Sequence, residues 1–116
     1  MSAGTYNITI DQGSDFTLNF TVKEDGSAKN LSSYSVRADL RKKREDSSPA
    51  VQFTGSVVNA SNGTAKIVLT NAQTKNLTAG FYFYDIEIFT ASDAEVIRVV
   101  QGTANVTREI TRWAFQ

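Results

Sequence analysis

Large apolar residues alternate with polar ones along most of this chain. The segment 16–22 shows the pattern most clearly, because every second residue from Phe16 to Val22 is large and apolar. Successive side chains of a β-strand point to opposite faces, so this pattern predicts a strand with one buried and one wet face. Similar patterns predict further strands over 6–10, 36–40, 51–53, 56–58, 65–70, 81–89 and 95–107.

Turn signals separate these segments and leave room for little helix. Asp25-Gly26 and Asn62-Gly63 are typical of tight turns. Between 71 and 76 the alternation stops, which suits one short helical turn crossing an end of the domain, with Gly80 closing the crossover. Gly102 predicts a bulge in the last strand. The fold class is therefore all-β: an antiparallel immunoglobulin-like β-sandwich of about 7–9 strands, with a small barrel as the alternative.

The run 77–84 favours the sandwich, because it imitates an immunoglobulin tyrosine corner. In that motif a tyrosine near the start of a late strand bonds to an upstream backbone group. Tyr82 would be the corner residue here, and Tyr84 would stand two positions on in the core. An ordinary core tyrosine is the alternative.

Composition bounds the class of protein. The 116 residues make one ordinary domain, which we assign to 1–107, followed by a C-terminal tail over 108–116. No run of about 18 apolar residues could span a membrane. Twelve basic and twelve acidic residues cancel, so no overall charge favours nucleic acid or an anionic membrane. No secretion signal is visible, so we expect the protein to be used where it is made or to be packaged.

Candidate reactive groups are few. Cysteine and histidine are absent, which removes thiolate nucleophiles, imidazole bases and the commonest zinc ligands. Asp85 and Glu87 share one strand face and could pair two carboxylates for acid and base work; the alternative is that they mark the wet face of a strand. We predict no enzyme activity, no catalytic residue, no cofactor and no metal site. Small-molecule substrates are accordingly not expected.

Two segments are candidates for contact with partner proteins. Arg41, Lys42, Lys43 and Arg44 form the only basic cluster, but Glu45 and Asp46 follow directly and no aromatic residue lies within the loop. A solvated or partner-facing loop is therefore favoured over a nucleic-acid site. The tail carries the only tryptophan close to the chain end, which is typical of an interface anchor, although the tail could instead fold back on its own domain. Its candidate residues are Arg108, Arg112, Trp113 and Phe115.

The order of features resembles the small β-sandwich structural proteins of tailed-bacteriophage virions, and is similar to the N-terminal domain of baseplate upper proteins. The resemblance covers nearly the whole chain. Its motifs are structural: Gly80 permits the corner, Asp85 and Glu87 mark the wet face, and Gly102 relieves the last strand. The segments that carry it are 3–8, 12–13, 16–18, 30–38, 77–87 and 98–112.

This resemblance implies a non-enzymatic assembly or adaptor module in the baseplate, tail, neck or capsid surface. It implies localisation in the virion after synthesis in the host cytoplasm. The implied partners are other virion proteins, including copies of the chain itself, with no nucleic acid or membrane. A full baseplate upper protein continues into a receptor-binding or fibre-holding region that this sequence lacks, so host recognition is not implied.

A carbohydrate-binding or host-adhesion module is the alternative function, because sandwich domains can present sugars with aromatic platforms. This hypothesis requires the candidate aromatic residues to be exposed together. They are Tyr6, Tyr34, Phe53 and Trp113.

Overall fold

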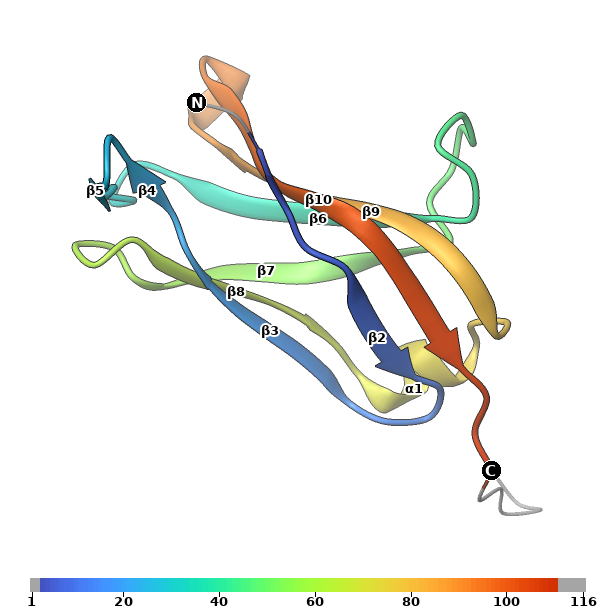
Figure 1. Ribbon diagram of the computed structural model, residues 1–116. Coiled ribbons are helices and arrows are strands. Elements are labelled where there is room, and N and C mark those ends of the chain that lie inside the picture. Colours follow the sequence, from blue (N-terminus) through green and yellow to red (C-terminus); the bar gives the residue numbers. More distant parts are fainter. Residues whose placement is uncertain (1–2, 111–116) are drawn as a thin grey trace.

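A computed structural model describes residues 3–110 as a curled, two-layered β-structure (Figure 1). Strands make up 56% and helix 7%, so the predicted all-β class is confirmed. Ten strands occur in this part of the chain, and three of them have only two residues. In order they are β1 (Gly4–Thr5), β2 (Ile8–Asp11), β3 (Phe16–Thr21), β4 (Lys23–Glu24), β5 (Ser27–Ala28), β6 (Ser35–Arg41), β7 (Val51–Asn59), β8 (Thr64–Leu69), β9 (Gly80–Phe89) and β10 (Val96–Thr107).

One continuous path of paired strands runs through both layers, in the order β1-β10-β9-β6-β7-β8-β3. The first layer contains β1, β2, β10, β9 and β6, the second contains β8 and β3, and β7 belongs to both. The first part of β7 pairs with β6 as far as Phe53, and the strand pairs with β8 from Thr54 onward. Gly55 lies directly after this change of partner. A Cβ at that position would stand 2.7 Å from the carbonyl oxygen of Val36 on β6, so only glycine fits there without displacement. The two short strands predicted over 51–53 and 56–58 are therefore one bent strand.

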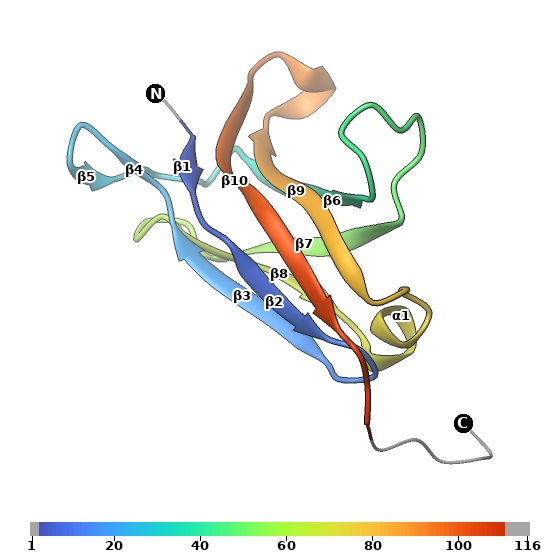
Figure 2. The same ribbon diagram turned by 45° about the vertical axis from the view of Figure 1, so that its right-hand side comes forward.

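The N-terminal strands lie on the outer edge of the first layer, where β1 and β2 both pair in parallel with β10 (Figure 2). The other strand pairs are antiparallel, as predicted. Local alternation gives no information on this parallel pairing, because it identifies the buried face of a strand and not its lateral neighbour.

Gly102 does not form the predicted bulge. The register shift in β10 lies between Arg98 and Val100, while Gly102 pairs directly with Tyr84 on β9. A Cβ at 102 would collide with the backbone carbonyl of Tyr6. The glycine is therefore needed for the close approach of the N-terminal segment to β10, and the bulge prediction was wrong.

The core lies between the layers and consists of the inward residues of the alternating strands. Ile10, Leu40, Ile67, Leu69, Ile86 and Ile88 are completely buried, and buried Phe53 contacts the rings of Phe16 and Tyr84. On the edge strand β3, Phe16, Leu18 and Phe20 are only half-buried. Burial of an aliphatic or aromatic side chain contributes about 1.5–3 kcal/mol, so this core is the main source of stability.

The predicted helical turn is α1 (Asn71–Lys75), which connects β8 to β9 across the end of the domain. The Thr70 side chain accepts from the Gln73 backbone amide, and the Gln73 side chain accepts from the Thr70 backbone amide, so the two residues form a capping box. The buried hydroxyl of Thr74 accepts from the amide of Gly13 and donates to the carbonyl of Ser14. The crossover is thereby attached to the turn between β2 and β3. A short 3-10 helix (Ala91–Asp93) connects β9 to β10.

We predict that Gly102→Ala destabilises the domain by about 1–3 kcal/mol, because overpacking against a fixed backbone group forces the chain to shift. Gly4→Ala is the matched control on the same pair of strands, since its Cβ would stand at an ordinary 3.8 Å from Val99. Urea denaturation measures both. Equal midpoints for the two variants would contradict the assigned role of Gly102.

Candidate interaction surface

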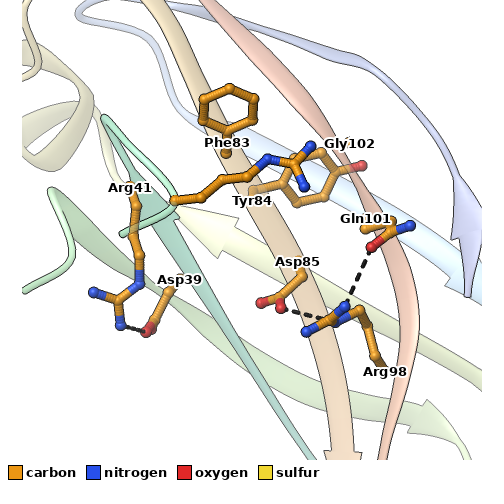
Figure 3. Close-up of a pocket in the computed structure, with 9 residues that line it drawn as sticks. Asp39, Arg41, Phe83, Tyr84, Asp85, Arg98, Gln101 and Gly102 are labelled. Carbon is orange, nitrogen blue, oxygen red and sulfur yellow. Dashed lines mark hydrogen bonds and ion pairs between the residues drawn. The ribbon is translucent and has the colours of Figure 1, made fainter. Parts of the chain in front are cut away.

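The outer face of the first layer carries alternating charges on three neighbouring strands. Arg37, Asp39 and Arg41 lie on β6, Asp85 and Glu87 on β9, and Arg98 on β10. Figure 3 shows four of them: Asp39, Arg41, Asp85 and Arg98. Each points outward because its neighbours in sequence fill the core. The strand register sets Arg37 opposite Glu87, and it also sets Asp39 directly opposite Asp85. Like charges in opposed positions destabilise a sheet, so each carboxylate needs a cation.

Three arginines supply those cations. Arg37 Nε lies 2.8 Å from Glu87 and Arg41 Nη2 lies 2.9 Å from Asp39. Arg98 Nε lies 3.1 Å from Asp85. Asp85 and Glu87 therefore belong to separate ion pairs on the wet face of β9 and do not converge on one point. All of these side chains are partly exposed, so each pair contributes only about 0.2–1 kcal/mol.

A shallow groove of about 310 Å³ lies between this charged face and the loop after β6. Asp85 lies in it with a raised pKa, because burial disfavours the carboxylate more than the nearby Arg98 favours it; Glu87 and Asp39 add to the increase. The groove is polar and open, and it can accept a polar side chain of another molecule. Its lining residues are Asp39, Arg41, Arg44, Phe83, Tyr84, Asp85, Arg98, Gln101 and Gly102.

The basic cluster lies beside this groove, over the aromatic residues at the start of β9. Lys42 Nζ is 4.6 Å from the centre of the Tyr82 ring, and the Arg44 guanidinium is 4.7 Å from that of Phe83. Phe81, two residues before Phe83, is 69% exposed. The sequence shows no aromatic residue within the loop, and the proximity of these rings depends on the pairing of β6 with β9. No signal within the loop could have predicted it.

The four basic residues of the loop have different surroundings. Arg41 donates to the Asp46 carbonyl and to Asp39, so it holds the loop in place. The Asp46 carboxylate accepts from the Lys43 backbone amide. Within residues 3–110, Lys42, Lys43 and Arg44 have no ion-pair partner. The acidic residues after the cluster therefore do not neutralise these three charges by direct contact.

The predicted tail lies mostly beyond the described part of the chain. Arg108 is exposed just after β10, and the amide of Glu109 donates to Gln12 Oε1 at 3.0 Å. Arg112, Trp113 and Phe115 lie outside the described residues, so their contact with a partner stays a prediction.

The predicted structural residues lie where the crossover meets the sheet. Gly80 has φ +141°, in the region that favours glycine. The Tyr82 hydroxyl donates to the carbonyl of Thr78 at 2.6 Å, which is the upstream backbone bond that the tyrosine-corner hypothesis requires. The Tyr84 hydroxyl donates to the carbonyl of Tyr6. Burial, with a smaller effect of Tyr6, raises the pKa of Tyr84 to about 12.

The aromatic platform of the alternative function does not assemble from the residues that the structure describes. Phe53 is buried in the core, Tyr34 donates its hydroxyl to Glu95, and exposed Tyr6 lies on the N-terminal segment beside β10. Within residues 3–110, no group of three or more acidic side chains is placed to hold a metal ion. No helix in that range is long and apolar enough to cross a membrane.

The fold and this outer face define a small two-layered β-domain with a charged strand surface. No described protein family and no curated protein matches the chain. Among solved structures, the chain is similar to the N-terminal domain of phage TP901-1 ORF48, with a TM-score of 0.59 and 13% identity. The match covers 91% of this chain and 98% of that domain. The resemblance inferred from the sequence is therefore confirmed at the level of the fold.

We predict that Arg98→Ala raises the pKa of Asp85 further, because the arginine is the main group that lowers it. Carboxyl chemical shifts followed by NMR across an acid titration measure this change. Lys43→Ala removes an unpaired charge from the neighbouring loop and serves as the control. An unchanged Asp85 titration in the Arg98 variant would contradict the ion pair.

The Tyr84 hydroxyl predicts a pH dependence of stability. The pKa of a tyrosine is ordinarily 10.0, which applies to the unfolded chain, and the pKa of Tyr84 is about 12 in the folded protein. Between these values the unfolded chain loses the proton while the folded chain keeps it, so the free energy of unfolding falls as pH rises. Below pH 10.0 the Tyr84 hydroxyl makes its full contribution to the free energy of unfolding. Tyr84→Phe should show a shallower decline in chemical denaturation over this range, and an identical slope would contradict the burial of the hydroxyl.

Proposed function

We propose that the protein is a structural component of a tailed-phage virion and acts as an assembly or adaptor module. One observation carries the proposal: the likeness of fold to a phage protein domain extends over nearly the full length of both chains. The sequence resemblance to virion β-sandwich proteins, including the N-terminal domain of baseplate upper proteins, supports it independently. Baseplate, tail, neck and capsid surface are the candidate positions.

The mechanism of such a module is assembly through a preformed surface. Its strands and their ion pairs hold the outer face in one conformation, so little conformational entropy is lost when a neighbour binds. The groove beside the 42–50 loop offers the partly exposed ring of Phe83 and the guanidinium of Arg44, which has no ion-pair partner in the described chain. These features suit an acidic or aromatic side chain from another virion protein.

The decisive experiment locates the protein in the particle. Electron microscopy of intact phage carrying a small epitope tag on this chain should show the tag at one repeated position. Purified particles should also contain the protein in a fixed ratio to the major structural proteins. Particles that lack the chain while it accumulates in the lysate would overturn the proposal.

We predict that Trp113→Ala abolishes incorporation into particles while the isolated domain stays folded, because tryptophan is a common interface anchor. Immunoblots of purified particles measure incorporation, and circular dichroism checks the fold. Tyr6→Ala, at a residue that is 56% exposed on the N-terminal segment, is an aromatic control for a non-specific loss of surface area. Normal incorporation of the Trp113 variant would refute the tail-anchor hypothesis.

A further inference from the structure

The edge strand β3 lacks the usual protection against pairing with another strand. It pairs with β8 alone among the described strands. Natural edge strands are commonly blunted by lysine, proline or a bulge. The stretch from Phe16 to Val22 contains none of these and no charge at all, and its pairing with β8 is regular throughout.

The backbone groups on the open side of β3 can be assigned from its register. Val22 donates its amide to the carbonyl of Gly63, in line with the β3–β8 register. Hydrogen-bonded positions alternate along an antiparallel pair, so Phe16, Leu18 and Phe20 also direct their backbone groups at β8. Thr17, Asn19 and Thr21 then direct theirs to the open edge, and their side chains are exposed.

The β4–β5 hairpin leaves this side open. The amide of Lys29 donates to the carbonyl of Val22 at 2.9 Å. That carbonyl lies on the same side of the strand as the Val22 amide, so β5 continues the line of β8 and does not cover the edge. The strand edge is accessible from Thr17 to Lys23.

We propose that β3 pairs in antiparallel fashion with β3 of a second copy of this chain, about a two-fold axis at Asn19. This register pairs Asn19 with Asn19 and Thr17 with Thr21 of the second copy. All of these residues direct their backbone groups to the open edge, so each pair can form hydrogen bonds. Each pair of this kind exchanges two hydrogen bonds. The second layers of the two copies then form one continuous sheet.

Charge complementarity favours a second copy in this register. Asp15 and Lys23 flank the uncharged stretch at equal distances from Asn19, so each Asp15 lies opposite Lys23 of the other copy. Both side chains are exposed, and Lys23 has no ion pair within residues 3–110. Asp15 accepts from Asn71 only through Oδ1, which leaves Oδ2 for the lysine. A shift by two residues would lose both ion pairs.

The half-buried residues of β3 support the same pairing. Leu18 and Phe20 would meet across the two-fold axis on the inner face, where each now lies partly exposed at the margin of the core. Aromatic and aliphatic pairs of this kind stabilise neighbouring strands. The inference does not depend on the virion role, because it uses only the edge strand and its flanking charges.

The first test is a charge placed on the two-fold axis. Asn19→Glu sets two carboxylates against each other in the dimer and should weaken association by about fivefold or more. Inside one chain the same glutamate faces Lys66 on β8, so the fold should be preserved. Ser56→Glu is the matched control, since Ser56 faces Lys66 from β7, away from the edge.

Sedimentation equilibrium of the full chain measures association, and urea denaturation checks each fold. We expect dimers for the natural chain and Ser56→Glu, with clear dissociation of folded Asn19→Glu. A natural chain that stays monomeric at its highest soluble concentration overturns the proposal. Equal association of all three proteins overturns it as well.

The second test fixes the register through disulfide formation, because the chain has no natural cysteine. Opposed Cα atoms in a hydrogen-bonded strand pair are about 5.5 Å apart, within the range that a disulfide bridges. Asn19→Cys should therefore form a covalent dimer rapidly under mild oxidation. Thr21→Cys is the control, because its two copies would lie four residues out of register. Equal rates for both variants would overturn the two-fold axis at Asn19.

Discussion

The contact between the backbone of Tyr6 and Gly102 determines which strand β1 and β2 pair with. The absence of a side chain at 102 lets the Tyr6 carbonyl approach β10, and the buried hydroxyl of Tyr84 donates to that carbonyl. The amide of Tyr6 also donates to Gln101. With these contacts in place, β2 pairs with β10 and not with β3. Because β2 pairs with β10, the outer edge of β3 in the second layer has no partner strand among the described residues.

A second constraint lies at the bend of β7. Gly55 allows the strand to leave β6 and continue along β8, so a single path of hydrogen bonds serves both layers. The buried residues of both layers then face one core, and the outward positions of β6, β9 and β10 become a single charged face. The three arginines on that face neutralise carboxylates that the register brings together. Their positions are a consequence of strand pairing, and their partial exposure makes them weak contributors to stability.

Alternation along the chain predicted which face of each long strand turns toward the core. Leu18, Leu40, Ile67 and Ile86 all lie on the inward faces that the pattern indicates, and the lapse between 71 and 76 correctly predicted α1. The pattern could not predict lateral neighbours, because alternation is the same whichever strand lies alongside. The parallel pairing of β2, the continuity of β7 and the role of Gly102 all depend on such neighbours. The aromatic residues beneath the 41–44 cluster were missed for the same reason.

The charge balance of the chain and its open strand edge have related consequences. A protein with a net charge near zero has little electrostatic repulsion between copies, and this favours association. An uncharged edge strand adds directional hydrogen-bond donors and acceptors, so association through it has a definite register. Asp15 and Lys23 then restrict that register, because charges of opposite sign at equal spacing satisfy each other only in one antiparallel alignment. An edge of this kind therefore promotes assembly in one preferred register.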